Sequence, residues 1–431
     1  MKIIIIGAGP VGAYTAGLCG YAGLEVEVFE KSKRAELKQD IGIIHFDVQD
    51  YEILGIPRPP QDHPMFLGTF EKLWQVPFDV EKKFSIDYPT DILHFTPFIN
   101  WIIDYANQSG NVDFYFDAPF ERPLIENNQL VGVQIGNNIG EKRGSCVIDC
   151  TGMHAIVRNS LPPELGIKPV RCRDGRLFRL HMEKWMCKSS FPHGSNTYVS
   201  FKGFANQVGE HETLIGTSTL GSWETTKEMF NEMIRVQNLE DIEHTVLETF
   251  AGEVPYDFPP ASLVGPGFLS IGDSGFQNKP FNGEGMVSGM RAAQIALPVI
   301  IDAAEENDFS VESLWPYNVN YFRTLGADFA MIRGTGETLV DLTPEEFNWM
   351  FDKGFMNKKM LQSTWEKYQA SFSFKTMLAA FHGLRRWQLF KKILRGIKFG
   401  TKFKKLYKKY PKTPDGLDKW QAKFENLITQ I

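Results

Sequence analysis

Three glycines close to the N-terminus have the spacing of a turn that binds a dinucleotide. Residues 2–6 are one Lys followed by four Ile, a pattern typical of a buried strand, and the glycines follow at once. Such a turn brings a pyrophosphate against a helix N-terminus, where free N–H groups and the helix dipole favour negative charge. The residues predicted to line this turn are Gly7, Gly9, Pro10, Val11 and Gly12.

An acidic residue follows at the distance expected of a carboxylate that binds ribose. Glu30 ends the apolar segment 26–30, about 20 residues after the glycines. A carboxylate at this position binds the ribose hydroxyls and fits adenosine without a 2′-phosphate. We expect Glu30 and the following Lys31 to contact the cofactor. The alternative is an ordinary strand-to-helix turn that holds no ligand.

A second glycine-containing segment, about 260 residues further along, indicates which dinucleotide is bound. Segment 268–271 reads as a short buried strand, and the small residues after Gly283 predict a closely packed helix. Asp273 can accept hydrogen bonds from sugar-alcohol hydroxyls, and FAD has a ribityl chain whereas NAD has none. The sequence therefore predicts FAD. The contacts expected from this segment are Gly272, Asp273, Pro280, Gly283, Gly285 and Met286.

A third segment of the same kind lies between these two. Residues 147–150 form an apolar strand that ends in a small-residue turn, in which Thr151 and Gly152 are further expected contacts. Each of the three turns could belong to any α/β protein. Their occurrence in this order favours a single FAD site.

Together these motifs resemble those of the FAD-dependent geranylgeranyl reductases, which are related to flavin aromatic hydroxylases. The segments that carry the resemblance are 7–12, Glu30, 149–152 and 272–285. The resemblance extends through most of the chain. It implies an α/β fold with a Rossmann-like FAD-binding domain of the glutathione-reductase and aromatic-hydroxylase type, an antiparallel β-sheet substrate domain and a C-terminal helical region. It also implies that reduced flavin gives hydride to C=C bonds of an isoprenoid chain.

The resemblance also identifies candidate catalytic and substrate-binding residues. Asp40 takes the position of a cysteine that the family carries near the flavin, and apolar surroundings would raise its pKa enough to make it a proton donor. His45 is a second candidate, because imidazole titrates near neutral pH. The alternatives are an exposed loop carboxylate and a structural histidine. Phe204 and Asn206 fall where the family has an aromatic lipid-pocket motif, so we expect both to contact substrate.

Composition agrees with a cytoplasmic enzyme. The chain has 431 residues, 43% of them hydrophobic, which is enough for two or three domains with ample core. Its five cysteines are scattered and give neither a disulfide framework nor metal-ligand spacing, so we expect no metal site. The first strand begins at residue 2, which leaves no room for a signal peptide. No apolar stretch approaches the ~18 residues of a membrane span; the longest, 292–301, is interrupted by Gln294 and Pro298.

Positive charge is concentrated at the C-terminal end. Residues 381–431 hold 14 Lys and Arg against three Asp and Glu, whereas the whole chain carries −6. Apolar residues recur among these cations at roughly helical spacing, and this surface could rest on an anionic membrane as a peripheral attachment. The alternative is a solvated face on helices that cap a domain. We expect no nucleic-acid partner, because no recognised binding module accompanies the charge.

These anchors give a draft organisation of the chain. We expect a discontinuous FAD-binding domain made of 1–70, 93–165 and 262–310. We expect a substrate-binding sheet domain made of 71–92 and 166–261, and a basic helical region made of 311–431. The elements expected within them are a helix at 97–107, a β-meander at 128–144, strands at 176–181, 196–201 and 212–217, and a helix at 225–235.

Three functions remain open from the sequence. A prenyl reductase would act on a hydrophobic prenyl chain or prenyl lipid. A flavin-dependent monooxygenase or tailoring enzyme would act on an aromatic or polar small molecule, and a membrane-associated flavoprotein would have no turnover. Because no second Gly-x-Gly-x-x-Gly occurs, electrons would come from transient NAD(P)H, a ferredoxin or another reductant. Fold analogy alone does not separate these functions.

Overall fold

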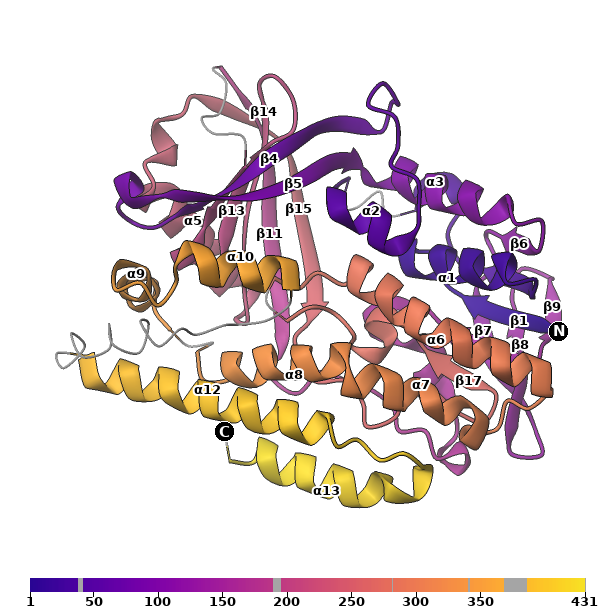
Figure 1. The fold of residues 1–431 in the computed structure, drawn as a ribbon. Coiled ribbons are helices and arrows are strands. Elements are labelled where there is room, and N and C mark those ends of the chain that lie inside the picture. Colours follow the sequence, from indigo (N-terminus) through magenta and orange to yellow (C-terminus); the bar gives the residue numbers. More distant parts are fainter. Residues whose placement is uncertain (38–41, 189–194, 281, 340–341, 368–385, 431) are drawn as a thin grey trace.

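The computed structural model describes residues 1–37, 42–188, 195–280, 282–339, 342–367 and 386–430. Figure 1 shows a parallel sheet flanked by helices, a larger twisted sheet beside it, and C-terminal helices that run along one side of the molecule. The α/β architecture with a separate antiparallel sheet and a helical C-terminal region is therefore confirmed. The limits of the domains remain a prediction.

The first sheet has six strands in the order β16-β17-β10-β1-β2-β6. Its strands are β1 (Lys2–Ile6), β2 (Glu25–Phe29), β6 (Val112–Tyr115), β10 (Cys146–Asp149), β16 (Val264–Gly265) and β17 (Phe268–Ser270). All neighbours are parallel except β16 and β17. A parallel sheet is covered on both faces, which explains the unbroken apolar runs of β1 and β10. The loops after β1, β10 and β17 all leave from one edge.

Helices cover this sheet and bury its apolar faces. They are α1 (Pro10–Tyr21), α2 (Val48–Leu54), α3 (Phe95–Asn107), α4 (Ile156–Ser160), α6 (Met286–Glu306) and α7 (Val311–Arg323). Small residues on α1 let its neighbours approach closely, since a Cβ added at Gly17 would lie 3.2 Å from Cβ of Ala106 on α3. The helix predicted at 97–107 is confirmed as α3, which begins two residues earlier.

A three-stranded meander packs beside the first sheet. It consists of β7 (Phe120–Glu126), β8 (Gln129–Ile135) and β9 (Gly140–Arg143), paired antiparallel. Asn127 and Asn128 adopt positive φ at the first turn, and Asn137 and Asn138 do so at the second. Asparagine tolerates this left-handed conformation better than most residues, which suits it to these turns. The predicted β-meander is confirmed.

The second sheet has eight strands in the order β15-β11-β14-β13-β12-β4-β5-β3. Its strands are β3 (Ile43–Asp47), β4 (Phe66–Val76), β5 (Phe84–His94), β11 (Leu177–Cys187), β12 (Ser195–Tyr198), β13 (Gly203–Gln207), β14 (Glu212–Thr219) and β15 (His244–Pro255). Neighbours are antiparallel except β12 and β4. The predicted helix at 225–235 is α5 (Trp223–Val236), which packs on one face of this sheet.

The C-terminal region is helical, as predicted. It contains α8 (Leu325–Gly336), α9 (Pro344–Asp352), α10 (Lys358–Lys367), α12 (Trp387–Tyr407) and α13 (Leu417–Ile428). Helix α12 lies along α8 at very short range, because a Cβ added at Gly400 would lie 2.4 Å from the Met331 carbonyl oxygen. Most apolar side chains of α12 face inward, including Phe399, Phe403 and Tyr407. They belong to the core of a capping bundle, which was the alternative to a membrane-facing apolar surface.

The prediction that no apolar segment approaches the length of a membrane span is wrong. Helix α6 continues through Pro298 for 21 residues, and within the described residues it is the one helix long and apolar enough to cross a bilayer. The sequence pattern underestimated it because Gln294 and Pro298 do not interrupt the helix. Much of α6 is buried, and it packs against α1 and α7, as a core helix does.

Candidate functional site

The three small-residue turns meet at one edge of the first sheet. The Ile271 N–H, just after β17, donates to the Asp149 carbonyl oxygen of β10 at 3.0 Å. A Cβ added at Gly272 would lie 3.1 Å from Cγ1 of Val11 on α1. Segments more than 250 residues apart in the sequence therefore contact one another where FAD was predicted to bind.

The first turn has the shape that a pyrophosphate needs. Gly7 has φ of +101°, and a Cβ there would lie 2.5 Å from the Cys150 carbonyl oxygen, while a Cβ at Gly12 would lie 1.9 Å from the Gly7 carbonyl oxygen. The packing of the backbone itself therefore requires both glycines. Gly9 differs, because no heavy atom lies within 4 Å of an added Cβ. This open space adjoins the first turn of α1, whose N–H groups have no acceptors within the helix.

The Glu30 carboxylate is held in place by backbone donors. Its Oε2 accepts from the Ala8 N–H at 2.9 Å, and its Oε1 accepts from the Ser32 N–H at 2.9 Å. Each oxygen keeps a further acceptor position for a ribose hydroxyl. Lys31 next to it is exposed. The geometry suits the ribose-binding role predicted for Glu30. The contacts of Glu30 and Lys31 with the cofactor remain predictions.

The second turn brings an aspartate to the start of α6. Gly272 has φ of +81°, and a Cβ added at Gly285 would lie 2.5 Å from Oδ1 of Asp273. A side chain at Gly285 would therefore collide with the Asp273 carboxylate. The loop continues through the buried Pro280 and through Gly283, which has φ of +74°, to Met286, the first residue of α6.

The third turn is fixed by a buried carboxylate. Asp149 accepts hydrogen bonds from the Thr151 N–H at 2.9 Å, from the Thr151 hydroxyl at 2.6 Å and from the Arg158 N–H at 2.8 Å. Burial raises the pKa of Asp149, and these hydrogen bonds oppose the shift. Gly152 has φ of +75° with nothing near its Cβ position. Thr151 and Gly152 are therefore presented at the same edge, and their contacts with FAD remain predictions.

The second sheet has an apolar inner face, and its strand β15 reaches the second turn, where a Cβ added at Gly283 would lie 3.4 Å from Cγ1 of Val254. One buried cluster joins β3, β5, β11, β14 and β15 with residues near β13; its buried members are Ile43, Ile92, Met182, Val208, Leu214 and Phe250. Ile43 lies on one edge strand of the sheet and Phe250 on the other. The sheet must curl for its two edges to share a cluster. We call this surface the inner wall.

Three residues predicted separately lie together on the inner wall. Nδ2 of Asn206 donates to Nε2 of His45 at 2.9 Å, and the ring of Phe204 lies edge-on to the imidazole with centroids 6.3 Å apart. Oδ1 of Asn206 accepts from the Ser195 hydroxyl at 2.9 Å. Since Nε2 accepts, the proton of the neutral ring is on Nδ1. Burial lowers the pKa of His45 to about 4, so this imidazole is neutral at pH 7.

The other catalytic candidate, Asp40, lies outside the described residues, and its role stays a prediction. Across the described parts of the chain, no group of three or more His, Cys, Asp and Glu side chains could hold a metal ion.

Sequence reasoning missed a buried polar cluster at the end of β3. Oδ2 of Asp47 accepts from the Tyr88 hydroxyl at 2.5 Å, and Oδ1 accepts from the Thr90 hydroxyl at 3.1 Å. The Trp365 ring of α10 lies 5.5 Å from the Tyr88 ring, and the Lys279 ammonium lies over the same indole at 5.3 Å. Burial raises the pKa of Asp47, against the nearby Lys279 ammonium and the Tyr88 hydroxyl. This cluster adjoins the loop that carries Pro280 and Gly283.

The pattern around Asp47 explains why it was missed. An aspartate immediately before a helix reads as an N-cap, and Asp47 does precede α2. Its side chain makes no capping hydrogen bond, however, and turns to β5 instead. The one available signal was strand alternation, which puts His45 and Asp47 on the same face of β3.

A second acid, Asp50, is buried on α2 without the same hydrogen bonds. It is 2% exposed. Burial raises its pKa from the ordinary 3.8 to about 7, with repulsion from Asp47 and Glu284 adding to the shift and Lys279 and Arg291 opposing it. The unfolded chain releases this proton at lower pH than the folded chain does. The Asp50 contribution to the free energy of unfolding therefore falls as pH rises from about 4 to about 7.

We expect Asp50→Asn to stabilise the protein above neutral pH. The variant removes a charge that is costly to bury, so its melting temperature at about pH 8 should rise by on the order of 5 °C. The difference should shrink toward about pH 4.5, where the folded wild type is protonated. Thermal unfolding of both proteins across this pH range measures the effect. A variant less stable than wild type at the alkaline end would contradict it.

Comparison with known proteins finds several digeranylgeranylglycerophospholipid reductases, one of which aligns over the full chain. No family model matches the chain. The digeranylgeranylglycerophospholipid reductase of Sulfolobus acidocaldarius is 23% identical over 100% of this chain and 97% of its own. The digeranylgeranylglycerophospholipid reductase 2 of Methanopyrus kandleri is 23% identical over 80% of this chain and 88% of its own.

A solved structure shares the fold over most of its length. A geranylgeranyl bacteriochlorophyll reductase-like protein from Thermoplasma acidophilum has a TM-score of 0.75 at 16% identity, covering 92% of this chain and 99% of its own. A flavin-dependent brominase has a TM-score of 0.64 at 13% identity, covering 90% and 99%. The predicted fold class is thereby confirmed.

Proposed function

We propose that this chain, a relative of the FAD-dependent geranylgeranyl reductases as its motifs predicted, reduces C=C bonds of an isoprenoid chain. It is an FAD-dependent oxidoreductase. The observation that carries the proposal is the apolar inner wall of the second sheet, whose strand β15 contacts the second of the three converging turns. A prenyl chain offers only apolar surface and double bonds, so an apolar wall next to the flavin is the environment it requires.

Three features have roles in holding FAD under this proposal. The first turn of α1 would bind the pyrophosphate, Glu30 the adenosine ribose, and Asp273 the ribityl hydroxyls. Bound here and reduced, FAD would supply the hydride that the double bond needs. The protein must therefore exclude water, align the chain, and give a proton to the other carbon.

We infer that the proton comes from the pair formed by Tyr88 and Asp47. The hydrogen bond between them and the raised pKa of Asp47 support this role. In the protonated form of Asp47, the carboxyl O–H donates to the Tyr88 oxygen; Tyr88 then gives its own hydroxyl proton to the substrate carbon as it receives the Asp47 proton, and solvent later reprotonates Asp47. Charge balances, because one hydride and one proton saturate one double bond.

His45 and Asn206 have a different role in this proposal. His45 is neutral at pH 7 and is therefore a poor proton donor. With Asn206 it forms a polar site on the otherwise apolar inner wall. Such a site orients the polar end of a substrate. Phe204 packs beside it.

The proposed partners follow from the same reaction. They are a hydrophobic prenyl chain or prenyl lipid, a reductant such as NAD(P)H or ferredoxin, and an anionic membrane surface reached through the basic C-terminal region. Saturating one bond consumes two electrons, so the reductant must reload FAD after each step.

Anaerobic flavin reoxidation tests the proposed function. The flavin is photoreduced without oxygen, and a polyprenyl glycerolipid dispersed in detergent is added while visible absorbance is followed. We expect the oxidised flavin spectrum to return and the lipid to gain two mass units per turnover. If the lipid has no effect and NAD(P)H, oxygen and a phenol give rapid turnover, the chain is a monooxygenase instead. No reaction in either assay would favour a flavoprotein without turnover.

A further inference from the structure

The outward face of α12 is a stripe of cations. Its exposed residues at helical spacing include Lys391, Lys398, Lys402 and Lys405, followed by Lys409 just beyond the helix. These positions differ by three, four or seven, which places them on one side of a helix. The opposite side of α12 is buried against α8 and the core. Figure 1 shows α12 and α13 on the outside of the molecule.

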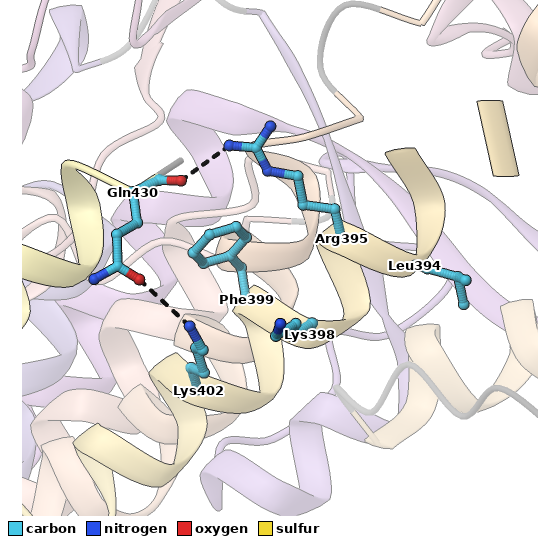
Figure 2. Close-up of a pocket in the computed structure, with 6 residues that line it drawn as sticks. All are labelled: Leu394, Arg395, Lys398, Phe399, Lys402 and Gln430. Carbon is cyan, nitrogen blue, oxygen red and sulfur yellow. Dashed lines mark hydrogen bonds between the residues drawn. The ribbon is translucent and has the colours of Figure 1, made fainter. Parts of the chain in front are cut away.

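Three of the helix cations surround a shallow pocket (Figure 2). Arg395, Lys398 and Lys402 line it with Leu394, the ring of Phe399 and Gln430, and its volume is about 560 Å³. The Arg395 guanidinium donates to the Gln430 carbonyl oxygen at 2.9 Å, and the Lys402 ammonium donates to Oε1 of Gln430 at 3.4 Å. The guanidinium and the ammonium lie 5.6 and 5.1 Å from the Phe399 ring centroid. The cations are thus held apart around an opening.

Two of the three pocket cations have no acidic partner among the described residues. On the flank of α12, Lys404 forms an ion pair with Asp328 at 2.6 Å. Lys398 and Lys402 make no ion pair with any acidic residue in the described ranges. Residues 381–431 carry a net +11 and the other 380 residues carry −17. An anionic surface therefore attracts this face and repels the rest of the molecule.

We propose that the α12 face docks on an anionic lipid bilayer and that the Arg395, Lys398 and Lys402 pocket receives a headgroup phosphate. A phosphate carries the charge and the several acceptor oxygens that three adjacent cations bind. The exposed Trp387 and Leu394 lie along the same helix and can enter the interfacial layer. That this docking serves substrate delivery rests on the proposed function. The surface itself rests on charge and geometry.

The structure favours a bilayer over other polyanions. The cations lie along one straight helix on the outside of the molecule, so they can all contact a flat membrane surface at once. The apolar tail residues are mostly buried in the capping bundle. The contact is therefore electrostatic at headgroup depth, and it should depend strongly on salt.

Vesicle cosedimentation tests the docking surface with the full-length, FAD-loaded protein. Phosphatidylcholine vesicles are compared with vesicles that contain about 30 mol % phosphatidylglycerol, at about 0.05 M and about 0.5 M NaCl. We expect binding to the anionic vesicles at low salt and its loss at high salt. The double variant Lys398→Gln/Lys402→Gln should bind about 30-fold more weakly, at roughly fivefold for each cation lost.

A matched variant controls for net charge. Lys72→Gln/Lys227→Gln removes two exposed lysines from the second sheet and α5, and it should bind like wild type. Equal binding to neutral vesicles, or equal loss in both double variants, would overturn the proposal. Displacement by inorganic phosphate at constant ionic strength would mean a free-phosphate site. Displacement by duplex DNA at matched phosphate would mean a general polyanion site, and either result replaces the bilayer.

Flavin reoxidation separates this proposal from the proposed function. If the protein binds anionic vesicles but does not reduce detergent-dispersed prenyl lipid, the docking proposal stands and the proposed reductase activity is wrong. If it reduces the dispersed lipid but does not bind vesicles, the reverse holds.

Discussion

Replacing Gly9 by alanine should abolish FAD binding and leave the apoprotein folded. Gly9 has φ of −62° and ψ of 176°, a conformation that alanine adopts without strain, and its Cβ would meet no atom of the protein within 4 Å. The same methyl group would occupy the space beside the α1 N-terminus where the pyrophosphate is proposed to lie. We expect FAD affinity to fall at least ~100-fold, because the phosphate would lose close contact with backbone donors.

Titration of apoprotein with FAD, followed by quenching of flavin fluorescence, measures this loss. Gly12→Ala is the matched variant, because its Cβ would lie 1.9 Å from the Gly7 carbonyl oxygen. That variant should lower the melting temperature of the apoprotein as well as its FAD affinity, whereas Gly9→Ala should lower only the affinity. If Gly9→Ala bound FAD within about threefold of wild type, the phosphate would have to lie elsewhere.

Replacing Asp47 by asparagine should slow substrate reduction about 100-fold without loss of FAD. The substitution removes the carboxyl proton that Tyr88 is proposed to take up, and general acid catalysis contributes on the order of 10²- to 10⁴-fold. Tyr88→Phe should have a comparable effect, since the phenylalanine ring fills the same space without the hydroxyl. Both variants should keep the visible spectrum of bound flavin.

Asp50→Asn provides the comparison for this effect. It removes another buried acid three residues away, on α2, which has no hydrogen bond to Tyr88 in the described structure. We expect its rate to stay within about threefold of wild type. The solvent deuterium isotope effect on flavin reoxidation should change in Asp47→Asn and Tyr88→Phe alone. Equal rates in Asp47→Asn and Asp50→Asn would remove the pair from the mechanism and leave Asp40 as the candidate.

Local sequence signals were enough to predict the FAD edge. The β1 strand, the three glycines and Glu30 lie within 30 residues, and each is set by near-neighbour chemistry. Parallel strands with buried apolar runs then bring the later turns to the same edge, because parallel neighbours end on the same side. The contacts between Val11 and Gly272 follow from that rule.

Pairings between strands far apart in the sequence could not be predicted from local sequence signals. The predicted strand at 176–181 proved to be β11, which continues to Cys187 because β14 and β15 pair with it on both sides. The predicted strand at 196–201 ends at Tyr198, where the chain turns. The parallel pairing of Asn196 with Trp74 joins segments more than 100 residues apart, and no local period signals it.

The polar residues of the inner wall show the same limit. His45 and Asn206 are 161 residues apart, so their hydrogen bond depends on the curl of the sheet. Asp47 has the sequence of an N-cap and becomes a partner of Tyr88 because β5 lies beside β3. The basic tail was correctly predicted to be helical. Which of its faces is exposed was decided by the close approach of α12 to α8.

The order of strands in the second sheet constrains how the newly made chain can fold. β3, β4 and β5 have been synthesised by residue 94, but the strand that joins them to the rest of the sheet, β12, begins at Ser195. About 100 residues of synthesis therefore pass while the β4 edge has no partner, and at about 5–20 residues per second that wait lasts about 5–20 s. A hairpin with an open edge is prone to associate with other chains. Binding of a chaperone to nascent chains should accordingly peak before β12 is made and fall once it has been added.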